Sequence, residues 1–126
     1  MAKARRPRVL VIDDDPGVRE VVHLLLASFG CDCQTAADGT SGLTHFDEGG
    51  WDLVLTDLAM PEMSGWEVVE AIRQRAPTLP IVLMTGSTGP DVMRRATEWR
   101  LPILPKPFPM QTLKATVVEA LYLKAS

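Results

Sequence analysis

The feature that most constrains the fold is a pair of short, uninterrupted apolar runs that end in acidic residues. Residues 9–12 and 53–56 are rich in Val, Leu and Ile, and aspartate follows each run directly. Apolar runs of about four to eight residues are typical of strands that are buried on both faces of a parallel sheet. Three further strands are predicted at residues 31–36, 80–84 and 103–104.

Helical patterns separate these strands. Asp15 followed by Pro16 is an N-cap with proline at the first helical position, and Gly30 ends the helix that begins there. Ser64 and Glu67 form a capping box that begins another helix. The remaining helices are predicted at residues 40–48, 91–99 and 111–123.

The first helix is predicted to be amphipathic. Its inward stripe is expected to contain Val18, Val21, Val22, Leu25 and Phe29. Leu24 lies on the other side of the helix and is expected to be exposed, where it could contact a partner protein. Strict alternation of strands and helices indicates an α/β fold in which a doubly wound, five-stranded parallel sheet is covered by five helices.

Five polar residues follow the ends of the predicted strands. Ligands of open α/β sheets bind beyond the carboxyl ends of the strands, so residues at those ends share one edge. The first strand is followed by two aspartates, and the others contribute one residue each. The predicted cluster consists of Asp13, Asp14, Asp57, Thr85 and Lys106.

The three carboxylates of this cluster predict a metal site. Neighbouring carboxylates repel one another unless a cation joins them. Mg²⁺ prefers oxygen ligands, and no His or Cys lies at this edge to favour zinc. A carboxylate can also act as a nucleophile toward phosphorus, which makes Asp57 the candidate phosphoacceptor, with Lys106 and the Thr85 hydroxyl placed to bind phosphoryl oxygens.

The sequence resembles the receiver domain of two-component response regulators from Arg8 to Ala125. The segments that carry the resemblance are VLVIDDDP, DLVLTDLAMPEMSGWE, PIVLMTGS and ILPKPF. The resemblance implies a flavodoxin-like strand order 2-1-3-4-5 and a domain over residues 8–126, preceded by a basic tail at residues 1–7. Two departures are Ile103, where the family usually carries an aromatic switch residue, and the segment Arg100-Leu101-Pro102 before it.

The resemblance also assigns roles to the cluster. Asp57 is implied to be the phosphoacceptor, Thr85 the switch hydroxyl and Lys106 the phosphate-binding lysine, with a cis peptide bond between Lys106 and Pro107. The implied Mg²⁺ ligands are Asp13, acting largely through water, Asp14, Asp57 and the backbone carbonyl of Ala59. The phosphoryl donor is expected to be a phosphohistidine on a sensor histidine kinase or a histidine phosphotransfer protein. Apart from self-phosphorylation and autodephosphorylation, we expect no enzymatic turnover.

Three alternative functions are weighed against this one. A phosphatase of the haloacid dehalogenase type would place its nucleophilic aspartate first, in an Asp-x-Asp motif, whereas Asp57-Leu58-Ala59 lacks the second carboxylate. A flavodoxin-like nucleotide binder would need a phosphate-cradling loop rather than three aspartates after the first strand. A pseudoreceiver would be expected to lack one of the five clustered residues. The sequence therefore favours a phosphorylatable switch.

Composition limits the partners and the compartment. The net charge of -3 argues against nucleic acid as a direct partner, and the tail with Lys3, Arg5 and Arg6 is expected to be solvated. The chain lacks a signal peptide or a spanning segment, so we expect a cytoplasmic protein that does not insert into membranes. Cys31 and Cys33 are expected to be buried thiols that do not bridge each other. No segment resembles an effector, so we expect a stand-alone receiver, a phosphorelay intermediate, or a piece of a hybrid kinase or larger regulator.

Overall fold

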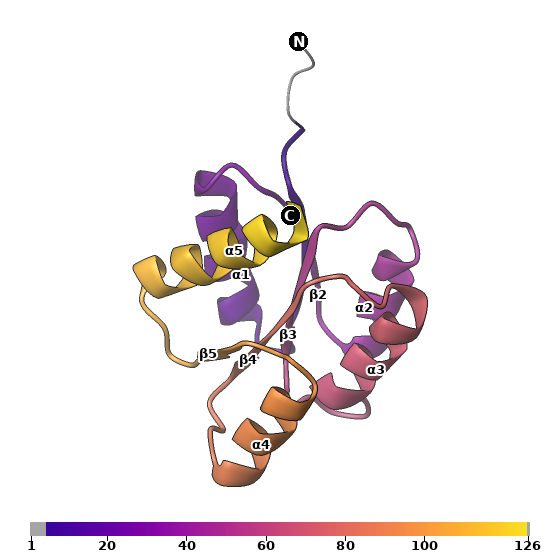
Figure 1. The fold of residues 1–126 in the computed structure, drawn as a ribbon. Coiled ribbons are helices and arrows are strands. Elements are labelled where there is room, and N and C mark those ends of the chain that lie inside the picture. The colour runs from indigo at the N-terminus through magenta and orange to yellow at the C-terminus, as the bar shows by residue number, and fades with distance from the viewer. Residues whose placement is uncertain (1–4, 126) are drawn as a thin grey trace.

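A computed structural model describes residues 5–125 of the chain and the side chains of residues 5–122. Within this range five parallel strands form one sheet in the order β2-β1-β3-β4-β5 (Figure 1), as predicted. The strands are β1 (Arg8–Ile12), β2 (Asp32–Ala36), β3 (Leu53–Asp57), β4 (Ile81–Thr85) and β5 (Ile103–Pro105).

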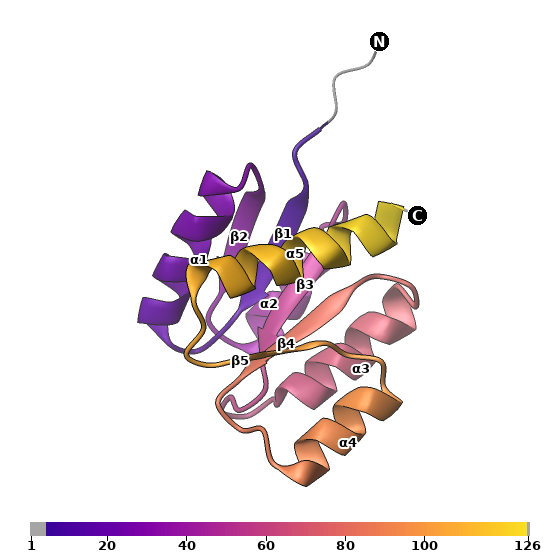
Figure 2. The ribbon, with the colours of Figure 1, turned by 60° about the vertical axis from the view of Figure 1, so that its left-hand side comes forward.

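Helices cover both faces of the sheet. They are α1 (Pro16–Ser28), α2 (Gly39–Phe46), α3 (Gly65–Arg75), α4 (Pro90–Glu98) and α5 (Met110–Ala125). Figure 2 shows α1 and α5 on one face and α2, α3 and α4 on the other. The chain thus forms the doubly wound α/β architecture that the alternating pattern predicts.

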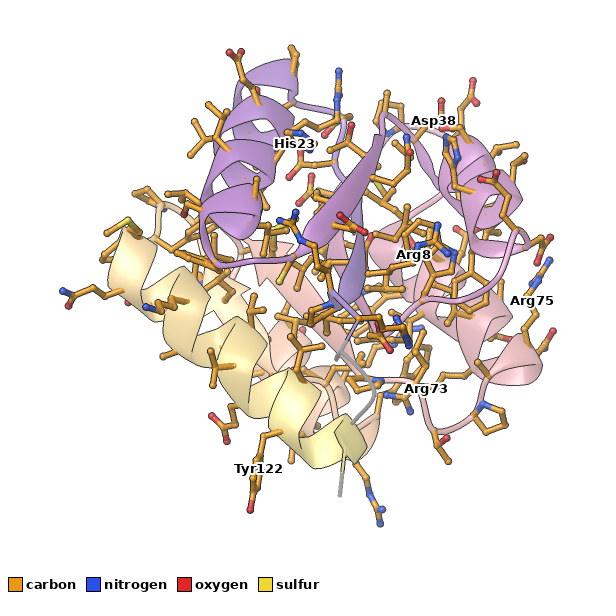
Figure 3. The ribbon with its side chains drawn as sticks, turned by 90° about the horizontal axis from the view of Figure 1, so that it is seen from above. Arg8, His23, Asp38, Arg73, Arg75 and Tyr122 are labelled. Atoms are coloured by element: carbon orange, nitrogen blue, oxygen red, sulfur yellow. The ribbon has the colours of Figure 1, made fainter. Side chains whose placement is uncertain are left out.

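The strands divide their side chains between two cores, which fill the space between the sheet and the helices (Figure 3). Along β1, Val9 and Val11 pack toward α1 and α5, whereas Leu10 and Ile12 pack toward the opposite helices. All four side chains are fully buried. This two-sided burial explains why the central strands appear in the sequence as continuous apolar runs rather than alternating ones.

Local signals begin the helices where the sequence predicts. The Asp15 carboxylate accepts hydrogen bonds from the backbone N–H groups of Gly17 and Val18 and caps α1. The Ser64 hydroxyl accepts a hydrogen bond from the Glu67 N–H and caps α3. Most of the other element boundaries differ from the predicted ones by one or two residues; for example, Cys31 still bonds back to Leu26, so the second strand begins only at Asp32.

The inward face of α1 differs from the predicted stripe. Val22 is fully buried as expected, but Val21 is 53% exposed and the prediction for it is wrong. Leu26 is fully buried instead, because it follows Val22 by four residues and therefore lies on the same side of the helix. Leu24 is 61% exposed, which confirms that prediction. Two apolar side chains of α1 therefore face solvent.

The N-terminal segment is attached to the domain more closely than a solvated tail. The exposed Arg5 guanidinium donates two hydrogen bonds of 2.8 Å to the buried Asp52 carboxylate. Asp52 also accepts a hydrogen bond from the Arg8 backbone N–H, and Arg6 donates to the Gly30 carbonyl. Lys3 lies outside the described residues. Arg5 and Arg6 are thus bonded to the domain while their side chains stay 63% and 57% exposed, so the expected solvation holds only in part.

The two cysteines are free thiols in the core beneath α1. Cys31 is buried and Cys33 is half-buried. Burial raises the pKa of the Cys31 thiol and raises the pKa of Cys33 to about 12. This agrees with the expectation of packed thiols. Among the described helices, none has the length and apolar character needed to cross a membrane.

Candidate functional site

The parallel sheet brings the five predicted site residues to one edge. Asp13 and Asp14 follow β1, Asp57 ends β3 and Thr85 ends β4. Lys106 follows β5, and its backbone N–H donates a hydrogen bond of 2.8 Å to the Thr85 carbonyl. Because the strands are parallel and in register, their carboxyl ends meet at this edge.

Asp13 is held in one orientation by several bonds. Its side chain is fully buried, and it accepts hydrogen bonds from the Lys106 ammonium at 2.6 Å and from the Asp15 N–H at 2.9 Å. Its backbone N–H donates to the Ala36 carbonyl, and its own carbonyl accepts from the Arg19 guanidinium at 2.8 Å. These bonds keep the loop between β1 and α1, which carries both aspartates, in place.

Asp57 is the buried acid at the centre of the cluster. Its Oδ1 atom accepts a hydrogen bond of 2.9 Å from the Leu58 N–H and lies 3.3 Å from the Lys106 ammonium. Burial and the neighbouring charge of Asp13 raise the pKa of Asp57 to about 6, against the opposing effect of Lys106. The site therefore holds more negative charge than its one ammonium compensates.

Lys106 compensates two carboxylates at once. Burial alone lowers its pKa, but the hydrogen bond and charge of Asp13, together with Asp57, outweigh burial and raise the pKa above its ordinary value. The side chain therefore remains an ammonium at neutral pH. The Lys106–Pro107 peptide bond is cis, as expected.

The three carboxylates fit a hard divalent cation. Asp13, Asp14 and Asp57 each offer an oxygen, and these oxygens lie within 4.8 Å of one another. Asp14 is exposed, which leaves one side of the cluster open to solvent and to a ligand. Carboxylate oxygens with room for water and phosphate oxygens are the ligands Mg²⁺ prefers. Ala59 lies in the exposed loop after β3, and its role as a carbonyl ligand stays a prediction.

Thr85 is buried at the end of β4, where its hydroxyl joins the strand to the following loop. Its Oγ1 atom accepts a hydrogen bond of 2.9 Å from the Ser87 N–H and lies 3.4 Å from the Ser87 carbonyl. Thr85 thus combines a place at the functional edge with a bond to the loop that leads into α4. Its role as the switch hydroxyl stays a prediction.

Two residues of the site escape prediction from sequence. Arg19 is indistinguishable from an ordinary surface arginine in the sequence, yet it holds the Asp13 carbonyl. Gly65 lies so close to β3 that a Cβ atom there would be 2.3 Å from the Asp57 carbonyl oxygen. A glycine directly after the Ser64 cap is the only local signal for this contact, because glycine is unusual inside a helix.

Comparison with known proteins identifies the family. The model of the response regulator receiver domain matches residues 9–118, which includes every clustered residue described above. The chain belongs to the response regulator receiver domain family. Receiver domains are components of two-component systems.

The curated relatives are larger proteins, of which the chain matches one part. The chain is 36% identical to the sensor histidine kinase RcsC of Salmonella typhimurium over 110 residues, which cover 86% of the chain and 12% of the relative. It is 34% identical to the DNA-binding transcriptional regulator NtrC of Salmonella typhimurium, covering 93% of the chain and 25% of that protein. The chain thus spans a quarter or less of these relatives.

Solved receiver structures have the same fold. The chemotaxis protein CheY4 of Vibrio cholerae is 31% identical, with a TM-score of 0.87 over 92% of this chain and 99% of the other. The response regulator TrrA of Thermotoga maritima, solved in complex with Mg²⁺-BeF, is 33% identical, with a TM-score of 0.82 over 91% of this chain and 99% of the other. Both similarities extend over almost the whole receiver.

Proposed function

We propose that this receiver is a phosphorylatable switch that accepts a phosphoryl group on Asp57 and thereby changes its partner-binding surface. The observation that carries the proposal is the environment of Asp57. This buried carboxylate lies 3.3 Å from the Lys106 ammonium and within 4.8 Å of the carboxylates of Asp13 and Asp14. Such a site pairs a nucleophile with the charges that phosphoryl transfer requires.

The residues have separate tasks in the transfer. Among the described residues, Lys106 and the Leu58 N–H both contact Oδ1 of Asp57, which leaves Oδ2 to attack phosphorus. In that step an O–P bond forms, the P–N bond of the phosphohistidine breaks and the imidazole leaves with the electron pair. Lys106 compensates negative charge on the phosphoryl oxygens, and the Thr85 hydroxyl donates a hydrogen bond to one of them.

Asp13, Asp14 and Asp57 would hold Mg²⁺, with the carbonyl of Ala59 as a further ligand. When bound, the ion would neutralise charge on the carboxylates and on the phosphoryl group. The raised pKa of Asp57 supports this assignment, since burial and the neighbouring charge of Asp13 disfavour its ionised form more than Lys106 stabilises it. Asp13 is already bonded to Lys106 and Asp15, which is consistent with contact to the ion through water.

The phosphoryl donor is proposed to dock beside α1. A cavity of about 520 Å³ lies next to Lys106, and its other walls include Val18, Val21 and Phe108. Val21 and Leu24 are exposed on the neighbouring helix surface. An apolar surface beside the reactive carboxylate suits a histidine-bearing helix of a sensor kinase or a phosphotransfer protein. We place this exchange in the cytoplasm and propose no turnover of an outside substrate.

The proposal is tested by measuring the intact mass of the protein after incubation with Mg²⁺ and acetyl phosphate. We expect one phosphoryl adduct on the wild type, none on Asp57→Asn and none when EDTA removes the metal. An adduct that survives Asp57→Asn, or no adduct on the wild type, contradicts the proposal. Repeated turnover of an unrelated phosphoester would instead favour a phosphatase.

A further inference from the structure

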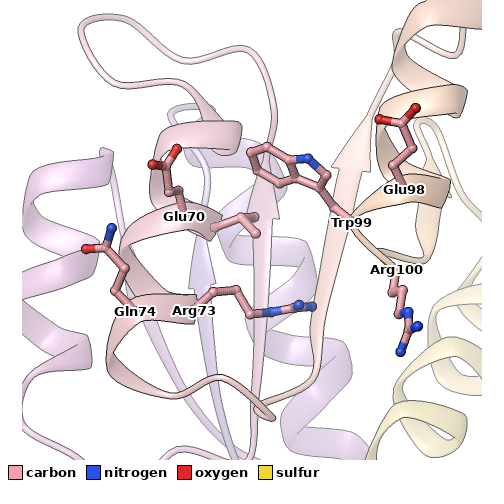
Figure 4. A pocket seen from close by; sticks show the side chains of 7 residues that line it. Glu70, Arg73, Gln74, Glu98, Trp99 and Arg100 are labelled. Carbon is pink, nitrogen blue, oxygen red and sulfur yellow. The ribbon is translucent and has the colours of Figure 1, made fainter.

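Two further cavities lie at the edge of the sheet opposite Asp57. One, of about 570 Å³, lies between α3 and α4 and is walled by Val69 and Trp99 (Figure 4). The other, of about 370 Å³, lies at the amino end of β4 and is walled by residues that include Leu79, Ile81 and Pro102. Both volumes are within the range of about 300–1,000 Å³ that small-molecule sites occupy.

Two arginines line both cavities. Arg73 comes from α3, and Arg100 follows α4 in the left-handed conformation, with φ of 57°. In residues 5–122 neither guanidinium forms a hydrogen bond or an ion pair, and the Nε atom of Arg73 is buried without a partner. Buried N–H groups are nearly always hydrogen-bonded, so this donor requires an acceptor.

The charge around these arginines favours an anion in the smaller cavity. Glu70 and Glu98 line the larger cavity, and Figure 4 shows their carboxylates at the end away from the guanidinium groups of Arg73 and Arg100. The smaller cavity is lined by the same two arginines and, within the described residues, by no acidic residue. The rest of its wall is mostly proline and aliphatic side chains.

We propose that the smaller cavity binds a small organic anion, whose carboxylate pairs with Arg73 and Arg100 and whose apolar body lies against Leu79, Ile81 and Pro102. Guanidinium groups recognise carboxylates through paired N–H donors, and the terminal N–H groups of Arg73 and Arg100 have no partner among the described residues. The site is at the amino end of β4, whereas Asp57 and Thr85 lie at carboxyl ends. It is therefore separate from the phosphorylation site and does not depend on the function proposed there.

The test uses hexanoate as the probe and the Nε–Hε signal of Arg73 in ¹⁵N-resolved NMR spectra as the readout. Arg73→Lys, which lacks that group, assigns the signal. We expect hexanoate to shift it in a saturable way, and hexanamide, acetate and inorganic phosphate to bind at least about tenfold more weakly, because each lacks the charge or the apolar body. The same result is expected for Asp57→Asn.

Variants separate this site from general surface charge. Arg100→Gln is an exposed change that leaves the fold intact, and it should weaken hexanoate binding about tenfold. Arg75→Gln is the matched control, because Arg75 is on the same helix but pairs with Asp47 outside both cavities. Equal binding of hexanamide or phosphate, no saturable shift up to about 10 mM, or equal effects of the two glutamine variants would overturn the proposal.

Discussion

Ionising the Asp57 carboxyl is less favourable in the folded protein than in the unfolded chain. Its pKa is about 6, above the ordinary value of 3.8, because of burial and the charge of Asp13. Between these two values the folded state binds more protons than the unfolded state. Stability from this residue is therefore present at acid pH, declines as pH rises from about 4 to 6, and stays low above that range.

Asp57→Asn should stabilise the metal-free protein at pH 7.5 by about 1–2 kcal/mol, because asparagine removes the buried charge and keeps an oxygen for the Leu58 N–H. Urea denaturation at pH 7.5 and pH 4 measures the effect. The gain should vanish at pH 4, where Asp57 is protonated in the folded wild type. A gain of the same size at both pH values would show that burial of the charge is not its cause.

Mg²⁺ should raise the free energy of unfolding of the wild type, because the carboxylates that repel one another would share a cation. At a hundredfold excess over Kd the increase is about 2.7 kcal/mol. Thermal unfolding with and without Mg²⁺ measures this shift. Asp14→Asn should abolish most of it, whereas Asp15→Asn should leave it unchanged, since Asp15 caps α1 and asparagine caps equally well. Equal losses in both variants would reject the assigned ligands.

The clustered residues could be predicted because each one follows a strand, and a strand end is a local pattern in sequence. The role of Arg19 could not be predicted, because its guanidinium donates a hydrogen bond to the carbonyl of Asp13, six residues earlier in the chain. The pairing of Arg73 with Arg100 around one cavity also escapes prediction. It depends on how the end of α3 and the segment after α4 pack together, which no local pattern describes.

The start of α3 is fitted against the end of β3 through Gly65. Its N–H donates a hydrogen bond of 2.7 Å to the Leu58 carbonyl, and a Cβ atom would meet the Asp57 backbone. Gly65→Ala should therefore destabilise the fold by about 2 kcal/mol or more and slow phosphorylation by acetyl phosphate. Gly86→Ala is the control, because no atom lies near a Cβ there. Urea denaturation measures the stability of both variants, and intact mass measures how fast they are phosphorylated. If Gly65→Ala were as stable as the wild type, the close contact would be contradicted.

The loop between β3 and α3 holds Glu62 in the left-handed conformation, with φ of 68°. Residues with a Cβ atom pay a steric cost there, which glycine avoids. Glu62→Gly should stabilise the receiver by about 0.5–1 kcal/mol, after the greater freedom of glycine in the unfolded chain is counted. Glu62→Ala, which retains the Cβ atom, should show no such gain in urea denaturation. A larger gain for alanine than for glycine would exclude this cause.

The helices show which local signals in the sequence are reliable. The caps Asp15 and Ser64 are predicted correctly because each bonds to backbone within one turn of its helix. Val21 was placed on the wrong side of α1, since Val21 and Val22 are adjacent and only packing against the sheet decides which one is buried. Leu26 is the residue that packing selects.

At the scale of the whole molecule, a signal from Asp57 has to reach the surface without the usual aromatic switch residue, because Ile103 occupies that position. The structure offers another connection. The Thr85 hydroxyl is bonded to the Ser87 N–H, and the loop leads to α4, whose one fully buried described side chain is Ala96. On α4, Arg95 lies 4.6 Å from the ring centroids of both Trp66 and Trp99.

The rings of Trp66 and Trp99 are packed edge to face, with centroids 5.4 Å apart. If phosphorylation draws the Thr85 hydroxyl away from Ser87, α4 should move and this edge-to-face contact should change. We expect Mg²⁺ with acetyl phosphate to alter tryptophan emission in the wild type and not in Thr85→Val. Trp99→Phe should remove most of the change, whereas Trp51→Phe should not, because Trp51 is buried beside Arg8. An unchanged signal in a protein that mass measurement shows to be phosphorylated would reject this route and leave the phosphorylation itself established.

The buried thiols of Cys31 and Cys33 have a practical consequence for such experiments. Thiol reagents attack the thiolate, and burial keeps both groups protonated at neutral pH. A cysteine introduced at an exposed position such as Val118 would therefore react with a maleimide dye much faster than the native pair. Fluorescent probes can thus be attached at chosen points of the surface without first removing the natural cysteines.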